Sequence, residues 1–158
     1  TGMLRSAAMS GNGEETILAA TAVLADAKVA PELESEARYY RSKALVEANQ
    51  LAHAVADWEA LAKDTRNVYG AEAKYRLAQY LFDSGKTKEA EQEVLNYLEV
   101  STPHAYWLAR SFVLLSDIYA KLDRKLEARQ YLLSLKQNYQ AADDIAGMIE
   151  SRLEKLNE

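Results

Sequence analysis

The residues best suited to metal chemistry are scarce, because the sequence contains two histidines and no cysteine. His53 and His104 lie far apart, each near the predicted start of a helix. A zinc site needs three or four ligands at a recognisable spacing, such as two histidines one turn apart on a helix. The sequence therefore predicts no metal site and no cofactor, and it excludes a thiolate nucleophile and a disulfide framework.

Carboxylates are numerous, but their positions do not favour acid–base catalysis, which needs two of them in a shared cleft with separated pKa values. Glu14 and Glu15, like Asp143 and Asp144, fall at predicted helix starts, where negative charge stabilises the helix dipole. No serine has a histidine and an aspartate in the frame of a catalytic triad. We expect no enzymatic activity.

The segment Gly11-Asn12-Gly13 superficially resembles a phosphate-binding loop. Such a loop needs a preceding strand, further glycines and usually a lysine. Here a helical pattern precedes the glycines, so a turn between two helices is the better interpretation.

Charge and hydropathy narrow the class of partner. The formal net charge of the 158 residues is −5, and acidic and basic residues alternate along the chain. Nucleic-acid binding needs clustered Lys and Arg, which are lacking, so we expect no nucleic-acid partner. No apolar run approaches the length of a membrane span and no signal-peptide pattern is present, so we expect no direct membrane insertion. The chain begins Thr1-Gly2-Met3, which leaves open whether it is a fragment of a longer protein.

The elements that must position any site are helices, because strong helix formers dominate and the chain has only six glycines and two prolines. Apolar residues recur at three and four positions throughout. Pro31 and Pro103 suit a first helical turn, and Ser101 or Thr102 suits a helix cap. The expected helices span 3–10, 14–27, 32–48, 51–63, 68–83, 87–100, 104–121, 125–138 and 142–156.

A helical hairpin recurs along the chain. Ala19, Ala54, Ala90 and Ala128 begin successive second helices and lie 35, 36 and 38 residues apart, a period typical of stacked helical hairpins. Two other features recur in phase with the last three alanines. Twelve positions before each alanine is a small residue: Ser42, Ala78 and Ser116. Five positions before each is a turn-forming residue: Asn49, Gly85 and Asp123.

Residues 71–103 resemble a tetratricopeptide repeat through Leu77, Ala78, Leu81, Gly85, Ala90, Val94 and Pro103. Residues 37–64 and 109–139 match less fully, and residues 3–27 match weakly. The resemblance implies an all-α, right-handed superhelix of antiparallel helix hairpins, forming a single domain over 1–158. It would comprise a partial repeat at 3–27, repeats at about 32–64, 68–101 and 104–139, and a C-terminal capping helix at about 142–156.

The family's common role implies a protein–protein interaction module or scaffold that holds a peptide or protein partner in a concave groove formed by the first helices. The expected partner-binding residues on that face are Tyr39, Lys43, Tyr75, Gln79, Phe82, Arg110 and Asp117. Aromatic residues beside charged ones are good interface anchors, although the same tyrosines can simply pack between helices. The face lacks the Lys, Arg and Asn pattern with which some family members bind a C-terminal carboxylate.

Two further expectations concern assembly. The Tyr-rich helices of irregular length are similar to those of bacterial cell-envelope members of the family, which favours periplasm or cell envelope over cytoplasm. The incomplete first hairpin leaves open an alternative function as a structural segment of a longer envelope solenoid. The incomplete first hairpin is expected to expose Met3, Leu4, Ile17 and Leu18, and to permit a weak homodimer through the N-terminal end.

Overall fold

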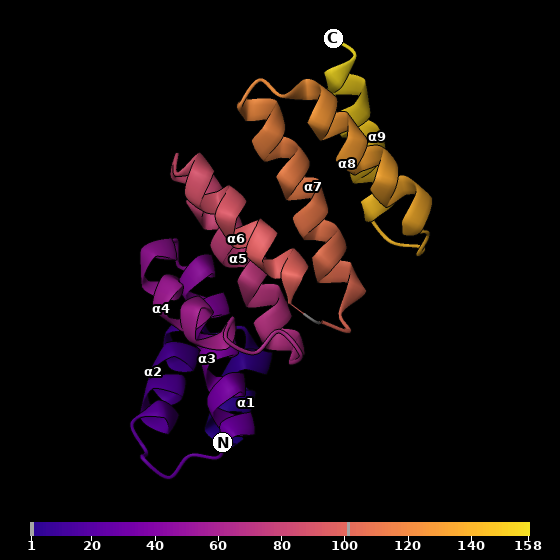
Figure 1. Ribbon diagram of the computed structural model, residues 1–158. Coiled ribbons are helices and arrows are strands. Elements are labelled where there is room, and N and C mark those ends of the chain that lie inside the picture. Colours follow the sequence, from indigo (N-terminus) through magenta and orange to yellow (C-terminus); the bar gives the residue numbers. More distant parts are fainter. Residues whose placement is uncertain (1, 101) are drawn as a thin grey trace. The chain divides into compact units, whose positions relative to one another are not determined.

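The computed structural model describes residues 2–100 and 102–158, and within them it contains nine α-helices and no strand (Figure 1). The all-α prediction is therefore confirmed for the described residues. Residues 1 and 101, the second of which is a predicted cap and the last residue of a predicted repeat, lie outside them. The helices are α1 (Gly2–Ser10), α2 (Gly13–Leu24), α3 (Pro31–Glu47), α4 (Leu51–Leu61), α5 (Val68–Asp83), α6 (Thr87–Glu99), α7 (Ala105–Lys121), α8 (Lys125–Asn138) and α9 (Ile145–Leu156).

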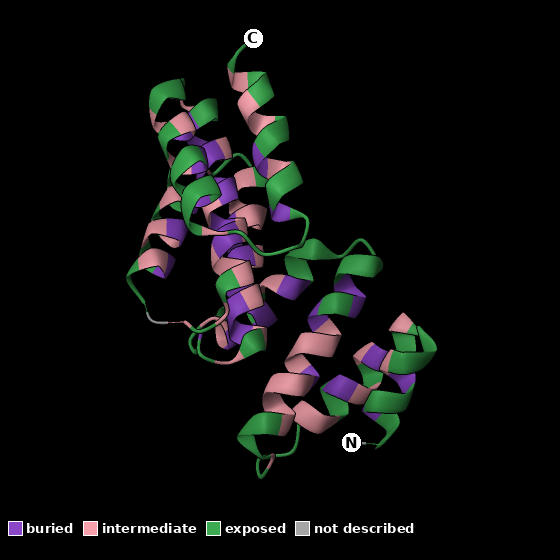
Figure 2. Ribbon diagram, turned by 90° about the vertical axis from the view of Figure 1, so that its right-hand side faces the viewer, coloured by how far each residue is buried: buried purple, intermediate pink, exposed green. Residues whose placement is uncertain are grey.

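The chain divides into two compact units, Thr1–Lys74 and Tyr75–Glu158, with the boundary inside α5. In each unit the buried positions lie on helix faces that meet other helices, and the exposed positions lie on the outer faces (Figure 2). The single domain over 1–158 stays a prediction.

Three helix hairpins are closed by the same turn. Asn49, Gly85 and Asp123 follow the ends of α3, α5 and α7, and all three have positive φ, at 60°, 82° and 61°. In each turn the next N–H bonds back to a carbonyl five residues earlier, for example Lys86 N to Leu81 O at 2.9 Å. This is the Schellman arrangement, which satisfies the last carbonyls of a helix and reverses the chain within a few residues. The predicted turn residues are thus confirmed.

The residues in phase with these turns are buried as the repeat requires. Ala54, Ala90 and Ala128 have no exposed surface, and the small residues Ser42, Ala78 and Ser116 are buried on the first helices. Small side chains at both positions allow two helices to approach closely. Four residues after each alanine, a large apolar side chain fills the hairpin core, namely Trp58, Val94 and Leu132.

The first hairpin follows a different phase from the predicted one. Ala19 is only partly buried, whereas Thr16 occupies the position three residues after the helix start that Ala54, Ala90 and Ala128 occupy elsewhere. The residue twelve positions before Thr16 is Leu4, which is fully buried against Ala20 and Ala37. A large first-helix residue is accommodated here because Ala20 is small where the other hairpins have Trp, Val or Leu. The assignment of Ala19 to the repeat was therefore wrong.

The helix ends differ from prediction where side chains capture the backbone. The second helix ends at Leu24 rather than 27 because Asp26 Oδ1 accepts a hydrogen bond from Lys28 N at 2.9 Å, which favours a turn. The last helix begins at Ile145 rather than 142, since Asp143 Oδ1 accepts from the Ile145 N–H. Pro31 stands in the first turn of α3 as expected, but Pro103 precedes α7, which begins at Ala105.

Helix α9 packs on α7 and α8, and its role as the cap of a superhelix stays a prediction. Ile145 and Ile149 are buried against Leu132 and Leu135 of α8 and Val113 of α7. Two ion pairs also join α9 to these helices: Arg152 pairs with Asp117 of α7, and Glu150 pairs with Lys136 of α8. The apolar stripe of α9 therefore closes the core of the second unit.

A buried carboxylate holds α3 and α4 together in the first unit. Asp57 on α4 is 1% exposed, and its two oxygens accept hydrogen bonds from Arg41 at 2.6 and 2.8 Å and from Arg38 at 3.3 Å. The hydrogen bond to Asp57 raises the pKa of Arg41 above its ordinary value, even though burial opposes this shift. The two arginines are thus the compensation for the buried charge of Asp57.

We predict that Asp57→Asn destabilises the protein by roughly 2–3 kcal/mol in urea unfolding followed by circular dichroism, because two arginines lose their common counter-charge. The control is Glu36→Gln, whose partner Arg5 is 60% exposed, and a much smaller loss is expected there. The hydrogen bond from Arg5 lowers the pKa of Glu36 below 4.5, so its small contribution is lost as the pH falls through that lowered pKa. Equal losses in the two variants would contradict the assignment.

Gly70, near the start of α5, lies against the backbone that precedes the helix. A Cβ atom at this position would lie 1.9 Å from Asp64 O and 2.5 Å from Leu61 O, both of which are backbone atoms that no rotamer change can move. Only glycine therefore fits where α4 turns into α5.

We predict that Gly70→Ala destabilises the protein by about 3 kcal/mol or more, because the backbone must shift to admit the methyl group. Gly147 is the matched control, since it lies within α9 and an added Cβ would meet nothing within 4 Å. Gly147→Ala should instead stabilise by about 0.5–1 kcal/mol through helix propensity. Urea midpoints that move in the same direction for both variants would refute the close approach.

Candidate functional site

Two predicted binding residues, Tyr39 and Lys43, belong to the first unit, where Tyr39 is part of a cluster of tyrosines on α3 and the start of α5. The ring of Tyr39 stacks on Tyr69 with centroids 4.3 Å apart and meets Tyr40 edge-on at 5.7 Å. Its hydroxyl donates to Glu72 at 3.3 Å, and Lys43 Nζ lies 5.9 Å from its ring centroid. Tyr39 and Lys43 are therefore neighbours, with Tyr39 partly buried and Lys43 exposed.

Lys43 also borders a small cavity of about 120 Å³ beside the turn between α1 and α2. Tyr40 and Glu47 line the same cavity from α3, and Gly11 and Gly13 line it from the turn. That turn is the helix–helix turn that the sequence predicts, since Gly11 has φ +75° and Asn12 Oδ1 caps α2 by accepting from Glu15 N. Gly11 therefore serves chain reversal, and Gly13 begins α2.

Arg110 on α7 is the centre of the candidate site in the second unit. Its Nη2 donates to the hydroxyl of Tyr75 on α5 at 3.0 Å, and its Nη1 donates to the hydroxyl of Tyr106 on α7 at 3.0 Å. The guanidinium carbon lies 4.8 Å from the ring centroid of Tyr75 and 5.9 Å from those of Tyr106 and Trp107. Two of the predicted residues, Tyr75 and Arg110, are thus in direct contact.

Both phenols are fixed in their role as acceptors from Arg110. The Tyr106 hydroxyl donates to Asp144 at 2.9 Å, and the Tyr75 hydroxyl donates to Gln79 Oε1 at 3.1 Å. Gln79 Nε2 in turn donates to Asp83 at 2.8 Å. Because each hydroxyl has one proton and uses it elsewhere, each can only accept from the guanidinium. The Arg110 network therefore runs from the start of α9 through α7 to the end of α5.

Among residues 2–100 and 102–158, no direct ion pair holds the Arg110 network together. Partial burial lowers the pKa of Arg110, but the hydrogen bonds to Tyr106 and Tyr75 outweigh it, and the net shift is upward. The pKa of Tyr106 is raised, mainly by burial, so its phenol is neutral at physiological pH. At neutral pH the site is a half-buried cation bonded to two uncharged oxygens.

The other predicted residues of the second unit have mainly structural contacts. Tyr75 is only 4% exposed and Phe82 packs against the same core, so their rings support the surface rather than form it. Asp117 accepts two hydrogen bonds from Arg152 of α9, at 2.8 and 3.1 Å. Partner binding by these residues stays a prediction, and Tyr75, Gln79 and Arg110 are the predicted residues that take part in the polar network.

Sequence reasoning missed Tyr106, Asp144 and Arg76 as members of this cluster. Arg76 lies 5.5 Å from the Trp107 ring and 5.7 Å from that of Tyr75. Tyr106 was detectable, since it lies one turn before Arg110 on the same helix face. Asp144 was not, because its pairing depends on how α9 returns onto α7.

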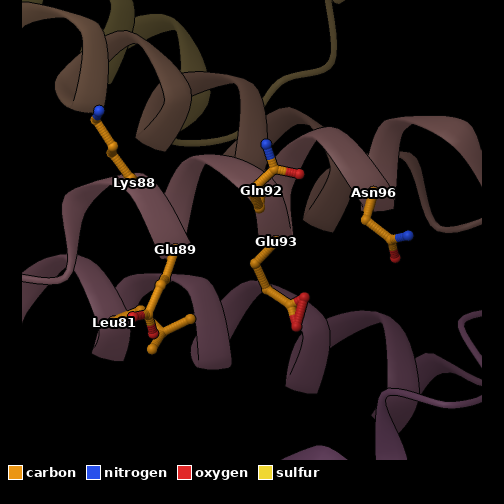
Figure 3. A pocket seen from close by; sticks show the side chains of 6 residues that line it. All are labelled: Leu81, Lys88, Glu89, Gln92, Glu93 and Asn96. Atoms are coloured by element: carbon orange, nitrogen blue, oxygen red, sulfur yellow. The ribbon is translucent and has the colours of Figure 1, made fainter.

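A second depression lies between α5 and α6 in the second unit, with a volume of about 470 Å³. Figure 3 shows Glu89 pointing from α6 toward Leu81 of α5, and Glu93 leaving the same side of α6 farther along the helix. Lys88, Gln92 and Asn96 line its rim, and these three side chains are exposed. The depression is open to solvent, so its two carboxylates are not in the enclosed cleft that acid–base catalysis requires.

Within residues 2–100 and 102–158, no group of three or more His, Cys, Asp or Glu is placed to hold a metal ion. His53 is exposed and His104 immediately precedes α7. None of the described helices has both the length and the apolar character to cross a membrane.

The N-terminal end exposes apolar side chains, though not the predicted set. Met3 and Leu18 are 79% and 66% exposed, and Met9 is 88% exposed. Leu4, in contrast, is fully buried beneath α2 and α3, and Ile17 is partly buried. The expectation for Leu4 was wrong because Leu4 fills the core of the first hairpin; the homodimer stays a prediction.

Comparison of this chain with protein-family models, curated proteins and solved structures found no match.

We predict that Tyr106 and Arg110 are energetically coupled. In a double-mutant cycle of Tyr106→Phe and Arg110→Gln, the coupling free energy should be about 1 kcal/mol, because each change removes the same charge-assisted hydrogen bond. Tyr119→Phe provides the control, since Tyr119 lies more than two helical turns from Arg110 and contacts Tyr131 instead. That pair should be additive within about 0.3 kcal/mol, and an additive Tyr106–Arg110 pair would show that the observed bond does not contribute.

Proposed function

We propose that this chain is a protein–protein interaction module that binds a peptide or protein segment along the first helices of its hairpins, α3, α5 and α7. The hairpins would stack as a right-handed superhelix of the tetratricopeptide type, with those helices lining its concave groove. Helical repeats of this kind provide extended binding surfaces because each repeat contributes one first helix to a common face.

The observation that carries the proposal is the Arg110 network. A half-buried arginine held by Tyr75 and Tyr106 and surrounded by aromatic rings has the composition of an interface anchor, in which Arg, Tyr and Trp are enriched. The ring of Tyr75 belongs to the apolar core, whereas the guanidinium of Arg110 is only partly buried and uses polar contacts that the core does not require. A binding role explains why polar and aromatic groups are concentrated on this face.

The alternative is a structural segment of a longer bacterial envelope solenoid with no independent ligand. The exposed apolar side chains of Met3, Met9 and Leu18 favour it, since a preceding repeat would cover such a surface. A periplasmic or envelope location is proposed for either function on the same family resemblance. The two functions differ in whether the first-helix face contacts a separate protein.

Site-specific photo-crosslinking in source cells separates the two. A benzophenone amino acid placed at Lys43 of α3 or Gln79 of α5 should crosslink to a partner protein, because both positions lie on the proposed face. Matched control positions are Glu59 of α4 and Leu126 of α8, which are exposed on second helices. All four variants should show unchanged circular dichroism.

A partner captured only from Glu59 or Leu126 would place binding on the second helices and contradict the proposal. Crosslinks from none of the four positions would favour the structural segment.

A further inference from the structure

The guanidinium of Arg110 has unused hydrogen-bonding capacity. It carries five N–H donors, and its protein bonds go to the hydroxyls of Tyr75 and Tyr106. Within the described part of the chain, no carboxylate forms an ion pair with it. Other arginines of the same unit differ, since Arg152 binds Asp117 and Arg124 binds Glu91 and Glu127.

The lack of a counter-charge is notable because Arg110 is half-buried and sits against three aromatic rings. A cation withdrawn from water is destabilised unless an opposite charge or strong dipoles compensate it. Here two phenol oxygens and the ring faces supply part of that compensation. Arg110 is therefore already partly removed from water in the free protein, so binding of an anion requires little further desolvation of this cation.

The phenols also fix the geometry of the guanidinium. Tyr75 and Tyr106 are anchored by Gln79 and Asp144, so the plane of Arg110 is defined before any ligand arrives. A preorganised arginine fork matches the two oxygens of a carboxylate and binds them with charge-assisted hydrogen bonds. Little side-chain entropy is lost on binding, which is an advantage of a preorganised site.

We infer that the partner segment carries an aspartate or glutamate whose carboxylate binds Arg110, an assignment that rests on the proposed function and names the chemistry of its ligand. The carboxylates of Asp144 and Asp83 end the network on either side, and both are negative. They disfavour a dianionic phosphate more than a singly charged carboxylate, because repulsion grows with ligand charge. An acidic side chain of a protein is thus the better fit.

The test is selection of a random dodecapeptide display library on the whole protein, followed by affinity measurement of the selected peptides. Peptides selected on the wild type should be enriched in Asp or Glu. Arg110→Gln should weaken them roughly tenfold or more, as expected for loss of a hydrogen-bonded charge pair. Arg129→Gln is the matched control, because it removes the same charge from α8, where the arginine donates to the neutral Asn157, and it should change affinity less than about twofold.

A second measurement changes the peptide and compares its binding to the wild type and to Arg110→Gln. Replacing the critical acidic residue of a selected peptide by its amide should weaken binding to wild type by a similar factor, and should have no further effect on Arg110→Gln. Selected peptides without acidic residues, or with equal affinity for Arg110→Gln, would overturn this inference and leave the proposed function standing. Failure of the wild type to select any peptide would overturn both.

Discussion

The turn that closes each helix hairpin is the constraint on which the rest of the structure depends. A positive φ at Asn49, Gly85 and Asp123 ends one helix and starts the next within four residues, so the two helices must pack antiparallel. That geometry brings the small residues of the first helix against the alanine of the second and fixes which faces are buried. Asn and Asp replace Gly at two of the turns because they tolerate the left-handed region better than other side chains do.

The candidate site follows from the same packing. Because α5 and α7 belong to successive hairpins whose second helices are α6 and α8, Tyr75 and Arg110 come into contact although they are 35 positions apart. Asp144, immediately before α9, accepts a hydrogen bond from Tyr106 and orients it. The polar network is thus built from three elements, and its cation has no direct carboxylate partner in the described chain. The same face that the packing leaves outside the apolar core is the one we propose for binding.

Much of this fold is predictable from spacing alone, because turns, alanines and apolar stripes recur in phase. The first hairpin is the exception. Its first helix has the large Leu4 where the others have a small residue, and its second helix has the small Ala20 where the others have a large one. A search for a repeating alanine therefore selects Ala19 in place of Thr16. The family resemblance selected the candidate site residues on the first helices, but it could not predict their contacts, since Asp144 and Arg152 reach α7 only through the return of α9. Tyr75 shows the difference. The sequence predicts the helix face on which it lies, but only the structure shows that its ring is buried and that its hydroxyl accepts from Arg110.

The most direct test of this account is NMR of the Arg110 guanidinium in the unliganded protein, with the resonance assigned by its loss in Arg110→Gln. A guanidinium held by two phenols should give a sharp Nε–H signal with slow rotation about its terminal C–N bonds and slow hydrogen exchange, and both should speed up in Tyr106→Phe. A signal averaged like that of an exposed arginine, unchanged by Tyr106→Phe, would show that Arg110 is not preorganised and would contradict the account.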